Sequence, residues 1–370
     1  MKLGLLYEIQ IPKPWTPGIE ARTYGEAMEQ IVLADQAGWA YVWAVEHHLL
    51  PQWSHCSAPE VFLGAVSQRT TRIRIGHGIA LLPRGFNHAL RVAERAAVLD
   101  ILSNGRVELG TGRAVTLQEL DGFEIAPDQT MPQWAEAIDI IVRAWRDEPV
   151  EHHGQFYDIP PSFVVPKPVQ DPHPPLWLAG TNPETFERAG RSGLGVLGFV
   201  TGKPADVQPR IDAYKAAVAG ATPVGDALND NAAVLMQTYC AETREQAIAD
   251  VEQALGKVAQ LAVDLFLPWA EQPAERNLES YRYLTRPAAA GDTRAGAYFG
   301  DTQERVRDGM IAVGTPDDLV DLFGRYDRMG VDQMLTWVQF GGLPHDRIMR
   351  SMELIAERVL PQLEPARQAP

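Results

Sequence analysis

The sequence predicts an α/β protein built as a single (β/α)8 TIM barrel with insertions, and three observations lead to this prediction. Short apolar segments alternate with helical patterns along all 370 residues. This strand and helix unit repeats in series, and no change in composition marks a linker. An apolar content of 45% is sufficient for one large core. We therefore expect residues 1–370 to form one barrel domain.

The predicted strands are short apolar runs, and most of them are followed by glycine, proline or polar residues. In chain order they cover residues 3–7, 41–45, 73–82, 106–113, 176–179, 196–200, 232–239 and 334–340. Each is separated from the next by a stretch that is long enough for a helix. Parallel strands joined by helices are the arrangement that a barrel requires.

The predicted helices follow from capping signals and apolar periodicity. A capping box, Thr23-x-x-Glu26, opens the first helix, and Asn87 is expected to cap the third. Trp134, Ile138 and Trp145 recur at helical spacing. The expected helices cover residues 23–38, 59–68, 87–102, 133–147, 203–219, 243–260, 315–330 and 345–360.

Two stretches interrupt the regular pattern. Residues 149–175 are rich in proline and form an excursion before the fifth strand. Residues 261–312 combine prolines, an Ala/Gly run and several aromatic side chains. We interpret this second stretch as an insertion over one face of the barrel, where it is either a lid or a disordered loop.

Charge and cysteine content restrict the class of function. The net charge of −15 argues against binding to nucleic acid or to an anionic membrane surface. Cys56 and Cys240 lack the spacing of a disulfide framework or a thiolate metal site. No secretory signal or apolar run of membrane length is present in the sequence, so we expect a cytoplasmic protein with a small-molecule ligand.

Barrel enzymes place their chemistry at the carboxyl ends of the strands, so residues at predicted strand ends are candidate site residues. These are Glu46, His47, His77, Gly78, Gly110, Arg113, Gly180, Thr181, Phe199, Phe340 and Gly341.

The segment 106–113 suggests an anion site. Gly110 and Gly112 allow a close backbone approach, and the guanidinium of Arg113 matches the geometry of a phosphate. The alternative is an ordinary barrel strand that ends in a solvated arginine. Gly180 and Thr181 lie at the end of the neighbouring predicted strand, before a helix that begins at Pro183, and are expected to contribute to anion binding together with Arg113.

That helix has its own alternative interpretation. Asn182 is placed as its N-cap and Pro183 as its first residue, so free N–H groups would face an anion at Thr181. Glu184 would satisfy the same helix end without any ligand.

The adjacent histidines after the second strand are candidates for catalysis. Neighbouring residues of a strand point to opposite faces, so only one of His47 and His48 is expected to face the barrel mouth. The sequence has no His-x-His and no His-Glu-x-x-His pattern, so we expect no metal. His77 is either a site residue or a core histidine.

Several linked motifs give the chain a resemblance to the bacterial luciferase-like flavin monooxygenases, also called the luciferase and alkanesulfonate monooxygenase family. The motifs are Glu46-His47-His48, IGHGIALLP at 75–83, LDILSNGRVELGTGR at 99–113, Gly122-Phe123, LAGTNPET at 178–185 and VGTP at 313–316. Their order and spacing together are more specific than any single motif.

The resemblance implies an enzyme that uses reduced flavin mononucleotide (FMN), supplied by a separate flavin reductase, and O2. A flavin hydroperoxide would then oxygenate a small apolar or aromatic substrate. Position by position, Arg113, Gly180 and Thr181 resemble the phosphate site, and Gly78-Ile79 resembles a cis peptide under the flavin ring. His47 resembles the mouth-facing histidine of the oxygen chemistry, with Glu46 beside it.

The resemblance also implies a homodimer, or a related heterodimer, formed through the helices at 59–68 and 88–102. Leu63 and Val92 are the positions at which we expect contact between subunits. Two other functions stay open. A deazaflavin-dependent oxidoreductase would transfer hydride on the same barrel, and a non-catalytic luciferase-like subunit would support a catalytic partner.

Overall fold

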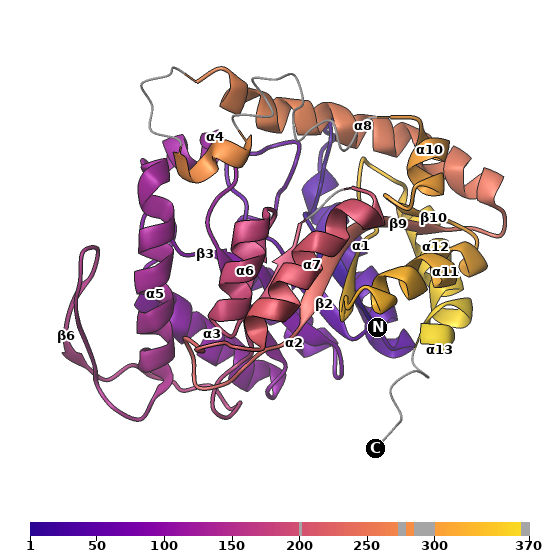
Figure 1. The fold of residues 1–370 in the computed structure, drawn as a ribbon. Helices are drawn as coiled ribbons and strands as arrows, with labels where there is room; N and C mark the ends of the chain where they lie inside the picture. The colour runs from indigo at the N-terminus through magenta and orange to yellow at the C-terminus, as the bar shows by residue number, and fades with distance from the viewer. Residues whose placement is uncertain (200–201, 273–278, 285–299, 364–370) are drawn as a thin grey trace.

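The computed structural model describes residues 1–199, 202–272, 279–284 and 300–363, and these form a closed parallel barrel (Figure 1). The strands pair in the order β11-β1-β2-β3-β4-β7-β8-β9, and β9 pairs with β11 to close the ring. The barrel strands are β1 (Lys2–Tyr7), β2 (Tyr41–Ala44), β3 (Arg74–Leu81), β4 (Val107–Gly112), β7 (Leu176–Gly180), β8 (Gly195–Gly198), β9 (Ala232–Cys240) and β11 (Gln333–Trp337). The predicted (β/α)8 fold is therefore confirmed.

Helices surround the barrel, and one of them crosses the top of the view in Figure 1. The larger helices are α1 (Ile19–Ala37), α2 (Pro59–Arg69), α3 (Ala89–Ser103), α5 (Thr130–Trp145), α6 (Pro183–Arg191), α7 (Pro204–Val218), α8 (Arg244–Ala270), α11 (Pro316–Arg328) and α12 (His345–Arg358). The short ones are α4 (Leu117–Gly122), α10 (Thr302–Arg307) and α13 (Leu360–Leu363), with 3-10 turns η1 (Pro127–Gln129) and η2 (Glu279–Tyr281). A short strand, β10 (Ala312–Gly314), extends beside the end of β9.

Burial explains why these segments form strands and helices. The barrel strands are buried along almost their whole length, which is why they are continuous apolar runs in the sequence. Helix α5 buries Trp134, Ile138, Ile141 and Trp145 along one face, as its periodicity predicts. Burying these aromatic and aliphatic side chains fixes the helix against the barrel.

Two local predictions were wrong. Helix α1 begins at Ile19, and Thr23 lies inside it with its hydroxyl bonded to the Ile19 carbonyl. His88, not Asn87, caps α3, because its ring accepts from the Leu90 amide. Local motifs mark where a helix end is possible, and packing decides which of the possible ends is used.

The two irregular stretches contain more regular structure than the sequence indicates. Residues 149–175 include an antiparallel hairpin, β5 (Val150–His153) with β6 (Asp158–Ser162), which projects beside α5 in Figure 1. Helix α8 continues to Ala270, ten residues beyond the expected end at 260. Residues 273–278 and 285–299 of the predicted insertion lie outside the described residues.

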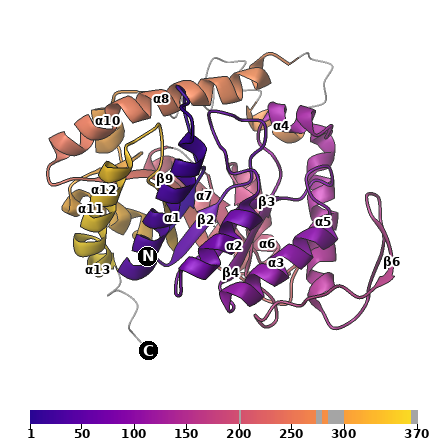
Figure 2. The ribbon, with the colours of Figure 1, turned by 180° about the vertical axis from the view of Figure 1, so that it is seen from behind.

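Helices α2 and α3 lie side by side on the outside of the barrel (Figure 2). Leu63 and Val92, which the sequence placed in a subunit interface, point into the chain's own core with exposures of 0% and 3%. The predicted subunit contacts at Leu63 and Val92 were therefore wrong. The large apolar side chains exposed on these helices are Val61, Val98, Ile101 and Leu102.

Within the described part of the chain, no helix is both long enough and apolar enough to cross a membrane.

Candidate active site

A cavity opens at the carboxyl ends of the barrel strands and encloses about 1080 Å3 of empty space, its mouth included. Side chains from strand ends on all sides of the barrel line it, and Leu265 and Phe266 of α8 and Tyr283 complete the wall. The strand-end residues are Glu8, Glu46, His47, Gly78, Ile79, Leu81, Gly112, Arg113, Leu178, Gly180, Thr181, Phe199, Leu235 and Trp337. The structure thus brings together every predicted cofactor residue except Gly110.

The floor of the cavity is formed by the end of β3. The Gly78–Ile79 peptide bond is cis, as the family resemblance implies, and both residues line the cavity. Gly110 lies behind this floor, where an added Cβ would come within 2.1 Å of the His77 carbonyl oxygen. A Cβ at Gly112 would come within 2.4 Å of the Ile79 Cδ1 atom. Both glycines therefore make room for the β3 backbone and for Ile79.

Arg113 marks one end of the cavity. Its guanidinium donates to the Ser280 carbonyl oxygen at 2.7 Å and to the Thr130 hydroxyl at 3.1 Å, and it lies 4.2 Å from the centre of the Tyr281 ring. A guanidinium has five N–H donors, so these contacts orient it and leave donors for an anion. The alternative of a solvated arginine at the end of an ordinary strand does not fit these contacts.

The start of α6 lies at the same end of the cavity. Asn182 is the N-cap and accepts from the Thr185 amide at 2.8 Å, with Pro183 as the first helical residue, so both predictions are confirmed. Glu184 is 67% exposed in its side chain and turns toward Arg282. Thr181 and Thr185 line the cavity beside Gly180. The hydroxyl and the amide of Thr185 both donate to Asn182, so the Thr181 hydroxyl is the side-chain donor that this helix end offers to an anion.

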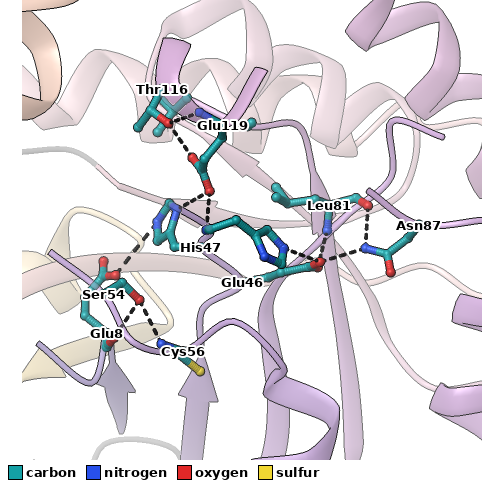
Figure 3. A network of polar contacts seen from close by, with 12 residues as sticks. Glu8, Glu46, His47, Ser54, Cys56, Leu81, Asn87, Thr116 and Glu119 are labelled. Carbon is teal, nitrogen blue, oxygen red and sulfur yellow. Dashed lines mark hydrogen bonds and ion pairs between the residues drawn. The ribbon is translucent and has the colours of Figure 1, made fainter. Parts of the chain in front are cut away.

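His47 also lines the cavity and is held between two carboxylates (Figure 3). Its Nδ1 atom lies 3.0 Å from Glu119 Oε1, and its Nε2 atom lies 3.8 Å from Glu8 Oε2. Burial by itself lowers the pKa of His47, but the charges of Glu119 and Glu8 outweigh burial and raise that pKa to about 9. His47 is therefore an imidazolium at neutral pH, with Nε2 directed to the cavity.

Glu119 fixes the ring of His47. Its carboxylate accepts from the Thr116 hydroxyl at 2.6 Å and from the His48 amide at 2.9 Å. Burial raises the pKa of Glu119, but the facing His47 charge outweighs burial and leaves that pKa below its ordinary value. Glu119 therefore stays ionised and holds the Nδ1 proton of His47.

Glu8 has a different environment. It follows β1, is 5% exposed, and its Oε2 atom has no hydrogen-bond partner among the described residues. The contact with His47 is within the range of charge attraction and too long for a hydrogen bond. Burial raises the pKa of Glu8 to about 7, against the opposing effect of His47.

Glu46 links the cavity floor to α3. Its carboxylate accepts hydrogen bonds from the Leu81 amide and from the Asn87 side chain, both at 2.8 Å. It also pairs with His48 Nε2 at 3.1 Å (Figure 3). His48 therefore turns away from His47, as expected for neighbouring residues. Because Glu46 binds the backbone just after Gly78 and Ile79, its first effect is on the shape of the floor.

His77 is a buried core histidine. It is 5% exposed and burial lowers its pKa to about 4, so it is neutral. The other strand-end candidates, Phe340 and Gly341, do not line the cavity.

Sequence analysis missed Glu8, Glu119, Thr185 and Tyr283. Glu8 is the first residue after a strand, so the carboxyl-end rule indicates it. Glu119 belongs to a Thr116-x-x-Glu119 capping pattern, which points to a helix start and not to a partner for His47. Tyr283 has no local signal. No cluster of His, Cys, Asp or Glu suited to a metal occurs in the described residues.

The structure therefore combines a closed parallel barrel with one cavity that is lined by Arg113, by His47 and by the carboxylates of Glu8 and Glu46. The chain belongs to the luciferase-like monooxygenase family, which it matches over residues 1–333.

Individual relatives agree with this assignment. The chain is 26% identical to the oxygenase component of the flavin-dependent trigonelline monooxygenase of Acinetobacter baylyi, over 92% of this chain and 90% of the relative. It is 24% identical to the F420-dependent glucose-6-phosphate dehydrogenase of Amycolatopsis mediterranei, over 91% and 94%. Among solved structures, a monooxygenase of Streptomyces bottropensis superposes with a TM-score of 0.77 at 27% identity, covering 98% of this chain and 99% of that one.

Proposed function

We propose that this protein is the oxygenase component of a two-component flavin monooxygenase. It would use reduced FMN, delivered by a separate reductase, and O2 to oxygenate a small organic substrate. The observation that carries this proposal is that one cavity is lined both by Arg113 with the start of α6 and by His47, which lies between two carboxylates. Similarity to the oxygenase component from Acinetobacter baylyi supports it.

The residues of the cavity fit FMN. Arg113, the Thr181 hydroxyl and the start of α6 would form a donor set for the phosphate. Gly78, which has no side chain, and the apolar side chain of Ile79 line the cavity and would contact the ring. When bound, reduced FMN supplies the electrons that activate O2.

The rest of the cavity keeps water away from the ring. Leu265 and Phe266 of α8, together with Phe199 and Leu235, make its wall apolar. A site of this kind has few groups that donate protons to reactive oxygen species, which limits the loss of peroxide to solvent. A lid function of residues 261–312 stays a prediction. The contribution of Leu265 and Phe266 of α8 to the cavity wall supports it.

His47 is the group we assign to the oxygen chemistry. Glu119 occupies its Nδ1 side, so the proton on Nε2 is the one that faces the cavity. In this position His47 would donate a hydrogen bond, or a proton, from Nε2 to an oxygen atom of the reacting species. Its pKa of about 9 keeps this proton in place at neutral pH.

We also propose a homodimer formed through α2 and α3, because Val61, Val98, Ile101 and Leu102 expose apolar side chains there. The cytoplasmic location stays the expectation from the sequence.

A deazaflavin-dependent oxidoreductase is the second candidate. Similarity to the F420-dependent dehydrogenase over 91% of the chain favours it, and His47 with its carboxylates would serve proton transfer in either reaction. Titration of the purified protein with oxidised FMN, reduced FMN and a deazaflavin separates the two candidates by affinity. A non-catalytic subunit should bind none of the three tightly.

The variant His47→Gln tests the role of the histidine. We expect FMN to bind as in the parent, because the residues assigned to the phosphate do not include His47. Product formation should fall by about 10²–10⁴, the usual effect of losing a positioned proton donor, and more of the O2 consumed should appear as hydrogen peroxide. His345→Gln, on α12 and bonded to Gln30, is the matched control. An unchanged peroxide yield would make His47 a packing residue.

A further inference from the structure

The feature that the flavin chemistry leaves unexplained is the buried carboxylate of Glu8. It lines the cavity, and its Oε2 atom, which lies 3.8 Å from His47 Nε2, has no hydrogen-bond partner among the described residues. A buried acceptor without a hydrogen bond costs free energy, so a ligand group that contacted this oxygen would be stabilised there.

The charges around Glu8 favour a positive ligand. Glu119 and His47 form a close ion pair at 3.0 Å whose charges cancel. Glu8 lies 3.8 Å from the other side of the His47 ring, so the three groups together carry one negative charge when Glu8 is ionised. A cation placed beside Glu8 would neutralise the group.

Two indole rings stand beside this carboxylate. Trp53 hydrogen-bonds to Glu8 through its side chain, which leaves the carboxylate oriented. The rings of Trp53 and Trp337 lie 5.8 Å apart at 54° and form an aromatic corner, and both line the cavity. Tryptophan faces bind organic cations better than other aromatic side chains do.

We propose that the substrate of this enzyme carries a compact organic cation, a quaternary ammonium or a positively charged aromatic nitrogen, which binds Glu8 in the corner of Trp53 and Trp337. This inference rests on the proposed function in one respect: the cationic ligand is called a substrate because the protein is proposed to be an oxygenase. The binding site itself is defined by residues that the flavin does not need.

The proposal predicts a pH dependence with a definite sign. Three titratable groups interact electrostatically with Glu8: His47, Glu119 and the thiol of Cys56. Glu46 contributes indirectly, because its charge raises the pKa of both His47 and Cys56. Burial raises the pKa of Glu8 to about 7. Glu8 therefore loses its proton as the pH rises through 7, and the affinity for a cation should rise over the same interval. Below that pH, binding should release a proton.

Two probes of equal shape and different charge provide the test. N-methylpyridinium is the cation, and toluene is its neutral counterpart with the same ring and methyl group. Calorimetric titration of the full chain, with and without FMN, measures both affinities. In Glu8→Gln we expect the cation to lose about ten- to a hundredfold in affinity, the scale of a close charge pair at a partly screened site. Toluene should bind the parent and the variant alike.

Controls separate this effect from folding and from net charge. Glu353→Gln removes the same charge from an exposed position on α12 and should leave both probes unaffected. The parent protein alone gives a second measurement, because its affinity for N-methylpyridinium should rise between about pH 6 and about pH 8. The proton released on binding should make the measured binding heat depend on the buffer.

Equal losses for both probes in Glu8→Gln, or a cation affinity that does not change with pH in the parent, would overturn the proposal. A variant that loses turnover but binds both probes normally would also overturn it, because Glu8 would then move protons instead of binding a cation. Failure of the proposed oxygenase function would appear separately, as an absence of FMN binding or oxygen consumption with the probe affinities unchanged.

Discussion

Removal of the Arg113 guanidinium is the sharpest test of where the cofactor binds. In Arg113→Ala, FMN should lose the charge-assisted hydrogen bonds to its phosphate, worth about 1.5–3 kcal/mol, or about 10- to 150-fold in Kd. Riboflavin has the same ring and no phosphate. Its affinity should therefore fall much less.

The structure shows why the comparison of the two ligands matters. Arg113 also stacks on Tyr281 at 4.2 Å and binds the Ser280 carbonyl, so its removal loosens η2 beside the cavity. That packing effect, about 0.5–2 kcal/mol for a cation and an aromatic ring, is shared by both ligands. The difference between the two losses isolates the phosphate contact.

Fluorescence or calorimetric titration with the two ligands provides the measurement. Arg191→Ala is the matched control, because Arg191 is exposed at the end of α6 and pairs with Glu187 outside the cavity. If FMN and riboflavin lose the same affinity in Arg113→Ala, the phosphate does not bind at Arg113 and the proposed orientation of the flavin is wrong.

Two further predictions concern the histidine and the assembly. Glu119→Gln removes the charge that most strongly raises the pKa of His47, so the pKa of His47 should fall from about 9 by about 1–3. NMR titration of labelled histidine measures this pKa, and Glu136→Gln is the control. An unchanged pKa in Glu119→Gln would refute the pairing of Glu119 with His47. Val98→Asp places a charge on the exposed apolar surface of α2 and α3 and should give monomers in analytical ultracentrifugation. Val165 is exposed outside these two helices, so the control Val165→Asp should stay a dimer. If the parent protein itself is a monomer, the proposed dimer is wrong.

The architecture was predictable because it depends on local patterns. Continuous apolar runs such as residues 232–239 report burial on both faces of a strand, and the alternation with helices permits few other folds. The position of the site followed from the same pattern, because parallel strands bring their carboxyl ends together. Arg113, Gly180 and His47 were therefore identified as site residues before their contacts were known.

What only the tertiary structure decided is which distant groups meet. Glu8 and Glu119 come from different parts of the chain, and no local pattern relates either of them to His47. Leu63 and Val98 are both apolar residues on outer helices, yet one faces the core and the other faces solvent. A sequence pattern reports the local environment of a segment. The charge state of His47 and the unpaired oxygen of Glu8 depend instead on distances across the barrel, which exist only after the strands have closed.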